Sequence, residues 1–212
     1  MLLRTILNRV QKFKSFVYGS ATFVDHEKEP AIHIEMLPRK NVRAVCSGCF
    51  KRQLGYDREY KPRLFEFIPV LGFKVFFVYT MRRVECPQCG VRVESVPWSS
   101  GKQQLTNTYA WHLAKWAKRL SWKETAEAFH STWHHVFKSV EMAVEWGRTH
   151  QSLTDVKSIG IDEIAWRKGH KYLTLVYQID EGSKRLIWIG EHRKVKTLLR
   201  FFRWFGQEKA KS

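Results

Sequence analysis

The spacing of hydrophobic residues along this chain changes between regions. Residues 65–86 alternate apolar and polar positions, which predicts β-strands with one buried face. That face carries Phe73, Val75, Phe77, Tyr79 and Met81. Gly72 follows two apolar residues in this stretch and predicts a hairpin turn. We expect a β-rich domain over residues 31–98.

The first residues instead repeat apolar positions at helical spacing, with Leu3, Ile6, Leu7, Val10 and Phe13 in register. Four basic residues interrupt this apolar series, so the segment does not resemble a secretory signal peptide. We predict a short amphipathic basic helix that packs against protein. Residues 1–30 are expected to hold this helix and a linker, which ends in the polar stretch 25–30.

Residues 102–150 have a helical period and follow a short Ser-Ser-Gly linker at 99–101. Thr106 or Thr108 can cap the first helix. Its inward face is expected to carry Tyr109, Leu113, Trp116, Ala117 and Leu120.

Two further helices and a tight turn follow in the same region. Ser121 and Glu124 have the spacing of a capping box, which predicts a helix over 122–129. A turn at 130–132 precedes a longer helix over 133–146, and this order is typical of a helix-turn-helix. Ala126 and Val136 have the spacing at which the two helices would touch. His130 stands where a turn glycine is usual, and histidine tolerates positive φ.

The second helix of this pair is the expected DNA-recognition element. It would present Trp133, His134, His135 and Lys138 to the major groove or its phosphates. The alternative is an ordinary three-helix core without DNA contact. His130 and His134 also have a metal-ligand spacing, but we see no third ligand for them.

The last region, 155–212, returns to strand patterns at 158–166, 172–179 and 185–190, separated by turns, and ends in an amphipathic helix over 195–205. Three antiparallel strands followed by a helix open an RNase H-like fold. The chain as a whole is therefore expected to be an α+β multidomain protein.

The charge balance indicates a polyanionic partner. Lys plus Arg number 37 and Asp plus Glu 20, a formal net charge of +17 that is spread over all regions. Residues 38–63 hold eight basic and two acidic side chains, and we expect Arg43, Lys51 and Arg52 to contact DNA. The alternative is a basic surface that serves solubility alone.

The four cysteines of the chain form two Cys-x-x-Cys pairs, Cys46/Cys49 and Cys86/Cys89. This spacing is typical of a four-thiolate structural zinc site. Redox dithiols or unrelated buried thiols are the alternative. The 36 residues between the pairs exceed the length expected for a compact ribbon, so we expect additional structure there. Thiols committed to a metal, and the absence of an apolar membrane span or export signal, predict a cytoplasmic protein.

Asp162 is a carboxylate within an otherwise apolar strand. Burying such a charge is costly unless a cation or another partner balances it. Carboxylates that hold two Mg²⁺ ions are what two-metal phosphoryl transfer requires, and a salt bridge is the alternative. Glu163 would point to the opposite face of the strand, and Asp180 is expected to form a turn.

Four sequence blocks together resemble the ISL3-type transposases of bacterial insertion sequences. They are C-S-G-C at 46–49, R-R-V-E-C-P-Q-C-G-V at 82–91 with the trailing V-P-W, S-W-K-E-T-A-E at 121–127, and I-G-I-D-E-I-A-W-R-K-G-H-K-Y-L-T-L-V at 159–176. The resemblance implies a DDE transposase, in which a zinc ribbon and a helix-turn-helix bind the terminal inverted repeats. An RNase H-like core would then cut and join DNA with Mg²⁺, and Asp162 matches the first catalytic aspartate.

The second aspartate and the glutamate of such a core have no counterpart in this chain. We therefore expect a truncated transposase that does not cleave DNA by itself, with an uncovered sheet edge that invites self-association or association with the full-length enzyme. One alternative is a non-catalytic DNA-binding regulator that occupies the element ends. Another is a zinc-ribbon factor of transcription or RNA processing.

Overall fold

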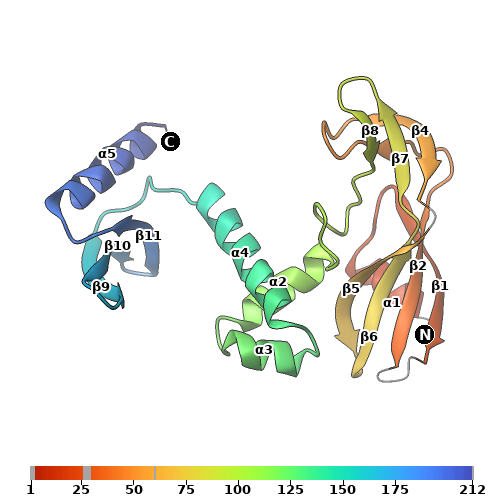
Figure 1. The fold of residues 1–212 in the computed structure, drawn as a ribbon, viewed down its shortest axis with the longest axis horizontal. Helices are drawn as coiled ribbons and strands as arrows, with labels where there is room; N and C mark the ends of the chain where they lie inside the picture. The colour runs from red at the N-terminus through yellow and green to blue at the C-terminus, as the bar shows by residue number, and fades with distance from the viewer. Residues whose placement is uncertain (1–2, 26–29, 60, 212) are drawn as a thin grey trace. The chain divides into compact units, whose positions relative to one another are not determined.

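The computed structural model describes residues 3–25, 30–59 and 61–211 (Figure 1). The chain has an α+β fold and divides into two compact units, Met1–Trp146 and Gly147–Ser212. Among the described residues, no helix has the length and apolar character needed to cross a bilayer.

The first unit has two four-stranded sheets, and the one with the longer strands is called the larger sheet here. Its strand order is β1-β2-β6-β5. These are β1 (Phe16–Val24), β2 (Ala31–Pro38), β6 (Phe73–Tyr79) and β5 (Arg63–Val70). The β2–β6 pair is parallel and the other two pairs are antiparallel. Helix α1 (Leu3–Val10) buries Leu7 against this core. Trp98, only 1% exposed, packs edge-on against several aromatic rings and marks the centre of the core.

The hairpin expected around Gly72 is confirmed, since β5 and β6 pair on either side of a turn in which Leu71 and Gly72 have φ of 52° and 84°. The expected linker before residue 30 is wrong in part, because Phe16–Val24 forms strand β1. Only its first positions alternate buried and partly buried, and the rest are largely exposed, so the strand pattern is short. Residues 26–29 of the expected polar stretch lie outside the described residues.

A second, smaller sheet carries the cysteines, with strand order β3-β4-β7-β8. Its strands are β3 (Ala44–Val45), β4 (Arg52–Arg58), β7 (Arg82–Cys86) and β8 (Gly90–Val93). The additional structure expected between the cysteine pairs is present. Strands β5 and β6 lie between β4 and β7 in the sequence but belong to the larger sheet. The alternating stretch at 65–79 therefore builds a separate sheet beside the cysteine ribbon.

Three helices follow in the sequence: α2 (Asn107–Trp116), α3 (Trp122–Ala128) and α4 (Trp133–Thr149). The first two belong to the first unit, and α4 extends past its last residue, Trp146. Thr106 caps α2, and the capping box of Ser121 and Glu124 is formed at α3. His130 has φ of 50°, as the turn requires. Ala126 and Val136 are buried in one cluster with Tyr109 and Leu113, while Trp116 remains 37% exposed.

The expected 99–101 linker is closely tied to the larger sheet. Ser99 is buried and its hydroxyl donates to the Gln103 carbonyl at 2.9 Å. The backbone amide of Glu66 on β5 donates to the Gln104 carbonyl at 2.7 Å, and the Thr106 amide donates back to the Glu66 carbonyl at 2.8 Å. These bonds place the start of α2 against β5.

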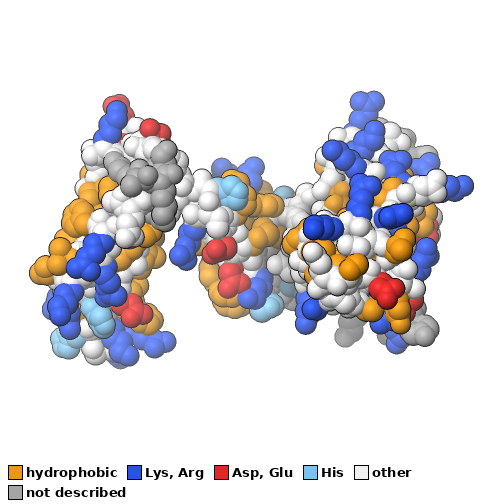
Figure 2. Space-filling view, turned by 90° about the horizontal axis from the view of Figure 1, so that it is seen from above, with side chains coloured by type: hydrophobic (Ala, Val, Ile, Leu, Met, Phe, Trp, Pro, Cys, Tyr) orange, Lys and Arg blue, Asp and Glu red, His pale blue; other side chains and the backbone are white. Residues whose placement is uncertain are grey.

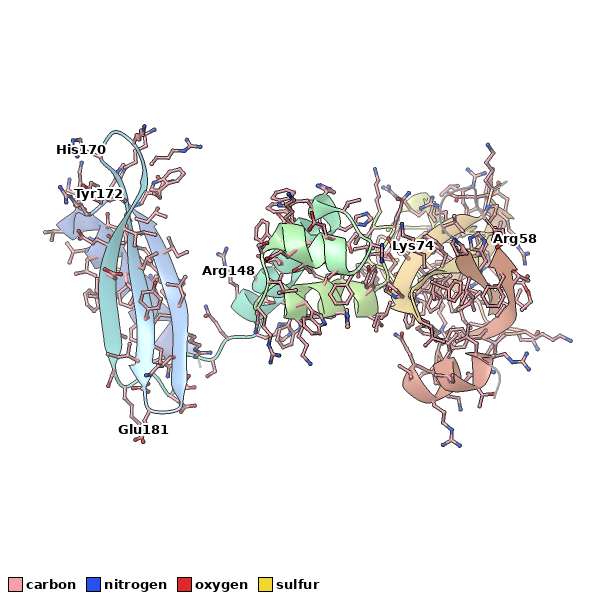
Figure 3. The ribbon with its side chains drawn as sticks, turned by 90° about the horizontal axis from the view of Figure 1, so that it is seen from below. Arg58, Lys74, Arg148, His170, Tyr172 and Glu181 are labelled. Carbon is pink, nitrogen blue, oxygen red and sulfur yellow. The ribbon has the colours of Figure 1, made fainter. Side chains whose placement is uncertain are left out.

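The second unit is a three-stranded antiparallel sheet followed by a helix, as the sequence pattern predicts. Its order is β11-β10-β9, with β9 (Ile159–Arg167), β10 (Lys171–Asp180) and β11 (Ser183–Glu191). The turns at His170 and Glu181 lie at opposite ends of this sheet (Figure 3). Helix α5 (Val195–Lys211) packs Phe201 onto Val176 and Ile187.

Candidate metal centre and nucleic-acid interface

The four cysteines converge in the smaller sheet. Their Sγ atoms all lie within 4.8 Å of one another, and the Sγ atoms of Cys49 and Cys86 are 3.6 Å apart. Sulfurs bound to one tetrahedral zinc ion at about 2.3 Å would be about 3.8 Å apart, so the cluster has the right size for such an ion. Cys46 and Cys86 are buried, and none of the four is in a disulfide. The cluster can therefore hold one metal ion.

The backbone around each cysteine pair is shaped to bring the thiols together. The Gly48 amide donates to Cys46 Sγ at 3.4 Å, and a Cβ at Gly48 would stand 2.8 Å from Cys89 Sγ. Phe50 and Gly90, each one residue past a cysteine pair, have φ of 58° and 70°. Glycine at position 48 is thus required by the close approach of the second pair.

The thiols influence one another strongly. The backbone amide of Cys49, and then that of Gly48, lower the pKa of the Cys46 thiol to about 7. Desolvation and the neighbouring thiols raise the pKa of Cys89 to about 12. Four thiols this close cannot all ionise without a cation among them, which is the condition that a bound metal satisfies.

The basic residues expected to contact DNA lie beside this centre. Arg43 precedes β3, Lys51 precedes β4, and Arg52 is the first residue of β4; all three are exposed. Figure 2 shows many lysine and arginine side chains on the visible surface of the body formed by β1–β8. Exposed cations therefore flank the first cysteine pair on both sides in the sequence.

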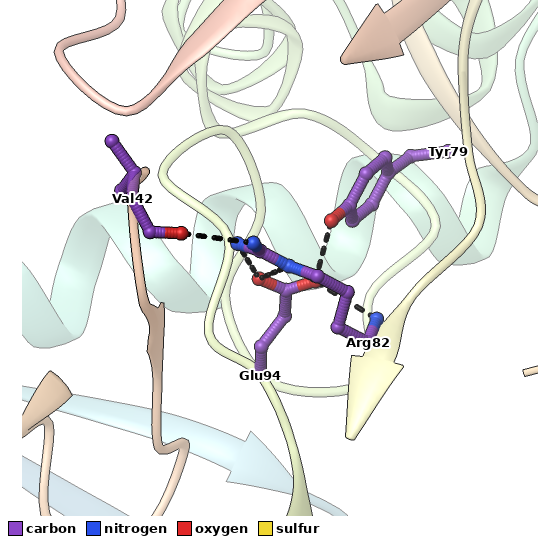
Figure 4. Close-up of polar contacts among 4 residues, drawn as sticks. All are labelled: Val42, Tyr79, Arg82 and Glu94. Carbon is purple, nitrogen blue, oxygen red and sulfur yellow. Dashed lines mark hydrogen bonds and ion pairs between the residues drawn. The ribbon is translucent and has the colours of Figure 1, made fainter. Parts of the chain in front are cut away.

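A buried ion pair between Arg82 and Glu94 was not anticipated from the sequence (Figure 4). Glu94 is 3% exposed and accepts hydrogen bonds from Arg82 Nε at 3.0 Å, Arg82 Nη2 at 2.7 Å and Tyr79 Oη at 2.5 Å. Arg82 Nη1 also donates to the Val42 carbonyl at 3.1 Å. The pair joins the end of β6, the start of β7 and the segment before β3. In the sequence, Glu94 stands within the valine-rich run V-R-V-E-S-V at 91–96, and this position alone hinted that it is buried.

Three of the four residues expected to read DNA from α4 face outward. Trp133 is 53% exposed, and His134 and Lys138 are also exposed. Trp133 stacks on Phe137 with ring centroids 5.5 Å apart, and Lys138 forms an ion pair with Glu141 at 2.7 Å. The exposed surface of the helix therefore carries an aromatic pair, His134 and the Lys138–Glu141 ion pair.

His135 points toward the larger sheet. Its Nδ1 lies 3.2 Å from the Ser131 hydroxyl and 3.7 Å from Glu66 Oε2. Burial lowers the pKa of His135. The two side chains line a concavity of about 550 Å³ together with Lys102, Gln103 and Gln104. In this arrangement His135 connects α4 to β5, a role that helical spacing alone does not reveal.

Asp162 lies on β9 and is exposed, so the expected cost of burying its charge does not arise. Within the described chain, β9 pairs with β10 only, and this leaves most of its side chains in solvent. Asp162 is opposite Leu175, and the Glu163 amide donates to its Oδ1 at 2.8 Å. The neighbouring pair, Ile161 and Val176, shares the face that α5 covers, so Asp162 lies on the other face.

Asp180, expected to form a turn, ends β10. Its carboxylate accepts hydrogen bonds from the amides of Lys157 at 3.0 Å and Ser158 at 2.7 Å, and from Gln178 Nε2 at 2.7 Å. The Lys157 amide and then the Gln178 side chain lower the pKa of Asp180. Asp180 therefore fixes the approach to β9, and its oxygens are already occupied.

The sheet and helix of the second unit lie within a segment that matches a known protein family. Residues 159–212 match the family model of ISL3-type DDE transposases, described as transposase. This part of the chain is thus similar to ISL3-type transposases. The match begins where β9 begins and includes Asp162, β10, β11 and α5.

Two curated relatives are also transposases. The chain is 32% identical over 178 residues to the transposase for insertion sequence element IS1557 of Mycobacterium tuberculosis, an alignment that covers 82% of this chain and 39% of the relative. It is 26% identical over 136 residues to the transposase for IS1001 of Bordetella parapertussis, covering 64% of this chain and 33% of the relative. The chain thus spans about two fifths or less of the relatives' length. No solved structure matches it.

Proposed function

We propose that this chain is part of an insertion-sequence transposase, in which the first unit binds the element's DNA ends and β9 supplies the first catalytic aspartate. The observation that carries the proposal is the family match to residues 159–212, which falls on the unit that carries Asp162. The similarity to the IS1557 transposase extends over 82% of the chain and so includes much of the first unit as well.

DNA binding by the first unit is supported by charge and by shape. The chain has a net charge of +17, and α3 and α4 are joined by the tight turn of a helix-turn-helix. Trp133, His134 and Lys138 on α4 would face a groove or its phosphates. Phosphate contacts of this kind would make affinity fall with rising salt. We propose terminal inverted repeats as the target, and the nucleoid as the cellular location that such binding would produce.

The metal in the cysteine cluster is proposed to be structural zinc. Four thiolates complete a tetrahedral shell and leave no open position for a substrate or water, which is the pattern of a structural site. The role of the ion would be to close the smaller sheet, and it would take no part in strand transfer. Elemental analysis of the purified protein should find one zinc per chain, and a different metal or none would overturn this assignment.

Catalysis would require more carboxylates than Asp162 provides. Within the described residues, the cysteine cluster is the only close group of three or more metal-binding side chains, so Asp162 does not stand in an acidic group. One carboxylate cannot position two Mg²⁺ ions. We expect no Mg²⁺-dependent nicking of duplex DNA by this chain alone. A nick that disappears in Asp162→Ala would contradict that expectation.

The same observation favours a second candidate, a non-catalytic DNA-binding regulator of transposition. A chain that binds element ends without cutting them would compete with an active transposase. Adding the purified chain to a strand-transfer reaction of a full-length relative should then inhibit it on shared end sequences. Competitor duplexes added to the inhibited reaction test the specificity. If an unrelated duplex relieves the inhibition as efficiently as an end sequence does, this role is contradicted.

A further inference from the structure

A basic concavity lies in the first unit, away from α4. It has a volume of about 400 Å³ and is lined by the loop between α1 and β1, by Arg43 and Val45 around β3, by Arg82, and by the chain from Glu94 to Pro97. Four separate segments of the sequence therefore form its walls. The family match, which begins at residue 159, does not include it.

The lining of this concavity is strongly cationic. Lys12, Lys14 and Arg43 are exposed, and the structure shows none of the three in an ion pair within the described part of the chain. The acidic residue in the lining is Glu94, and its charge is balanced by Arg82. Three formal positive charges thus remain around a concavity of about 400 Å³, a concentration that attracts an anion.

The cations are held on rigid backbone. Phe13, between the two lysines, is 6% exposed and packs on Trp98 with ring centroids 5.6 Å apart. The Arg39 amide donates to the Ser15 carbonyl at 3.0 Å and fixes this loop to the end of β2. On the opposite wall, the Ser95 amide donates to the Val45 carbonyl at 2.7 Å. A preformed arrangement of this kind lowers the entropic cost of binding.

The chemistry of the cations indicates phosphate. Two lysines provide point charges and an arginine provides a planar fork, a combination suited to a group with several charged oxygens. Arg43 and Val45 of the lining also belong to the basic segment 38–63, which contains Cys46 and Cys49. We propose that the concavity formed by Lys12, Lys14 and Arg43 binds a backbone phosphate of duplex DNA. This inference rests on the DNA-binding function proposed above, and it adds a contact that is independent of α4.

The test compares two variants of equal charge. In the first, Lys12, Lys14 and Arg43 are replaced by glutamine. In the matched control, glutamine replaces Lys184, Lys196 and Arg200, which are exposed, belong to the second unit and do not line the concavity. Affinity for a short synthetic duplex of arbitrary sequence is measured by fluorescence anisotropy at several salt concentrations. Circular dichroism and zinc content establish that both variants are folded.

The first variant should bind about tenfold more weakly than the control, and the slope of log affinity against log salt should fall by about 0.9, the value for one lost phosphate contact. Equal losses in the two variants would overturn the inference, because bulk charge would then explain the effect. Unlabelled polyglutamate that displaces the duplex as well as unlabelled DNA of equal charge would also overturn it. That result would indicate an acidic protein partner. If the unaltered chain does not bind duplex DNA at all, the proposed function fails and this inference fails with it.

Discussion

Glu94 carries a buried negative charge at the junction between the two sheets of the first unit. Its carboxylate is bound by Arg82 and Tyr79, and the side-chain exposures of Arg82 and Glu94 are 14% and 1%. Removing one partner of such a pair lowers the free energy of unfolding by far more than the pair itself contributes, because the other charge then remains buried without a partner. Burial, and then the Glu94 carboxylate, raise the pKa of Tyr79, so Tyr79 stays a neutral donor.

Replacing Glu94 with Gln should therefore destabilise the first unit by about 3–5 kcal/mol, because Arg82 loses its counter-charge in a buried site. Urea unfolding followed by circular dichroism measures this change. Asp57→Asn, which breaks the exposed ion pair with Arg83, serves as the control and should have a much smaller effect. Similar losses in the two variants would show that burial of the Arg82 pair is unimportant.

Gly48→Ala should weaken metal binding. The added methyl group would stand 2.8 Å from Cys89 Sγ and would push the two cysteine pairs apart. We expect zinc affinity to fall by about tenfold, or about 1.4 kcal/mol, in competition with a chelator. Gly55→Ala is the control, because a Cβ there meets no atom within 4 Å. Unchanged affinity in Gly48→Ala would contradict the close packing of the two pairs.

At the scale of elements, helix ends were predictable because they depend on neighbours in sequence. The capping box at α3 joins residues three apart, with the Ser121 amide donating to Glu124 Oε2 at 2.8 Å and the Glu124 amide donating to Ser121 Oγ at 3.2 Å. Strand β1 was missed because its second half is largely exposed and its pairing with β2 depends on tertiary structure. For the same reason, spacing on α4 placed His135 with the outward residues, although Glu66 from β5 faces it.

Removing the cap of α3 tests how much this element contributes. Ser121→Ala should lower stability by about 1 kcal/mol, because the Glu124 amide loses its acceptor. Ser121→Asp retains an acceptor and should recover most of the loss. Thermal unfolding of both variants provides the measurement, and an equal loss in Ala and Asp would contradict the capping role.

Asp180 should make the second unit sensitive to acid. Hydrogen bonds from the Lys157 amide, the Gln178 side chain and the Ser158 amide lower its pKa below the usual 3.8. The stability gained from a lowered carboxyl pKa is present above 3.8 and is lost as pH falls through the lower, folded value.

Asp180→Asn should therefore destabilise the protein at neutral pH, and the difference from the unaltered chain should shrink as pH falls below 3.8. Urea unfolding at a series of pH values measures this difference. Glu181→Gln in the same turn is the control (Figure 3) and should show no such trend. A destabilisation in Asp180→Asn that stays constant down to low pH would contradict the role of the charge.

At the scale of the whole molecule, metal ligands and helices could be predicted from short spacings, whereas the contacts between elements could not. The four cysteines and Asp162 lie in short motifs, so the metal centre and the match to a transposase family were both accessible from sequence. The separate sheet of β1, β2, β5 and β6, and the Arg82–Glu94 pair, depend on residues brought together only by folding. The exposure of β9 likewise depends on its having one neighbouring strand in the described chain.

The central claim is that a metal-organised basic unit of this chain binds DNA. Its most direct test is the affinity of the purified protein for duplex DNA before and after zinc removal, at low and moderate salt. A metal-organised DNA-binding unit should bind tightly at low salt and more weakly as salt rises, and its binding should be lost on chelation and return when zinc is restored. Absence of DNA binding by the zinc-loaded protein, or binding that zinc removal leaves unchanged, would contradict it.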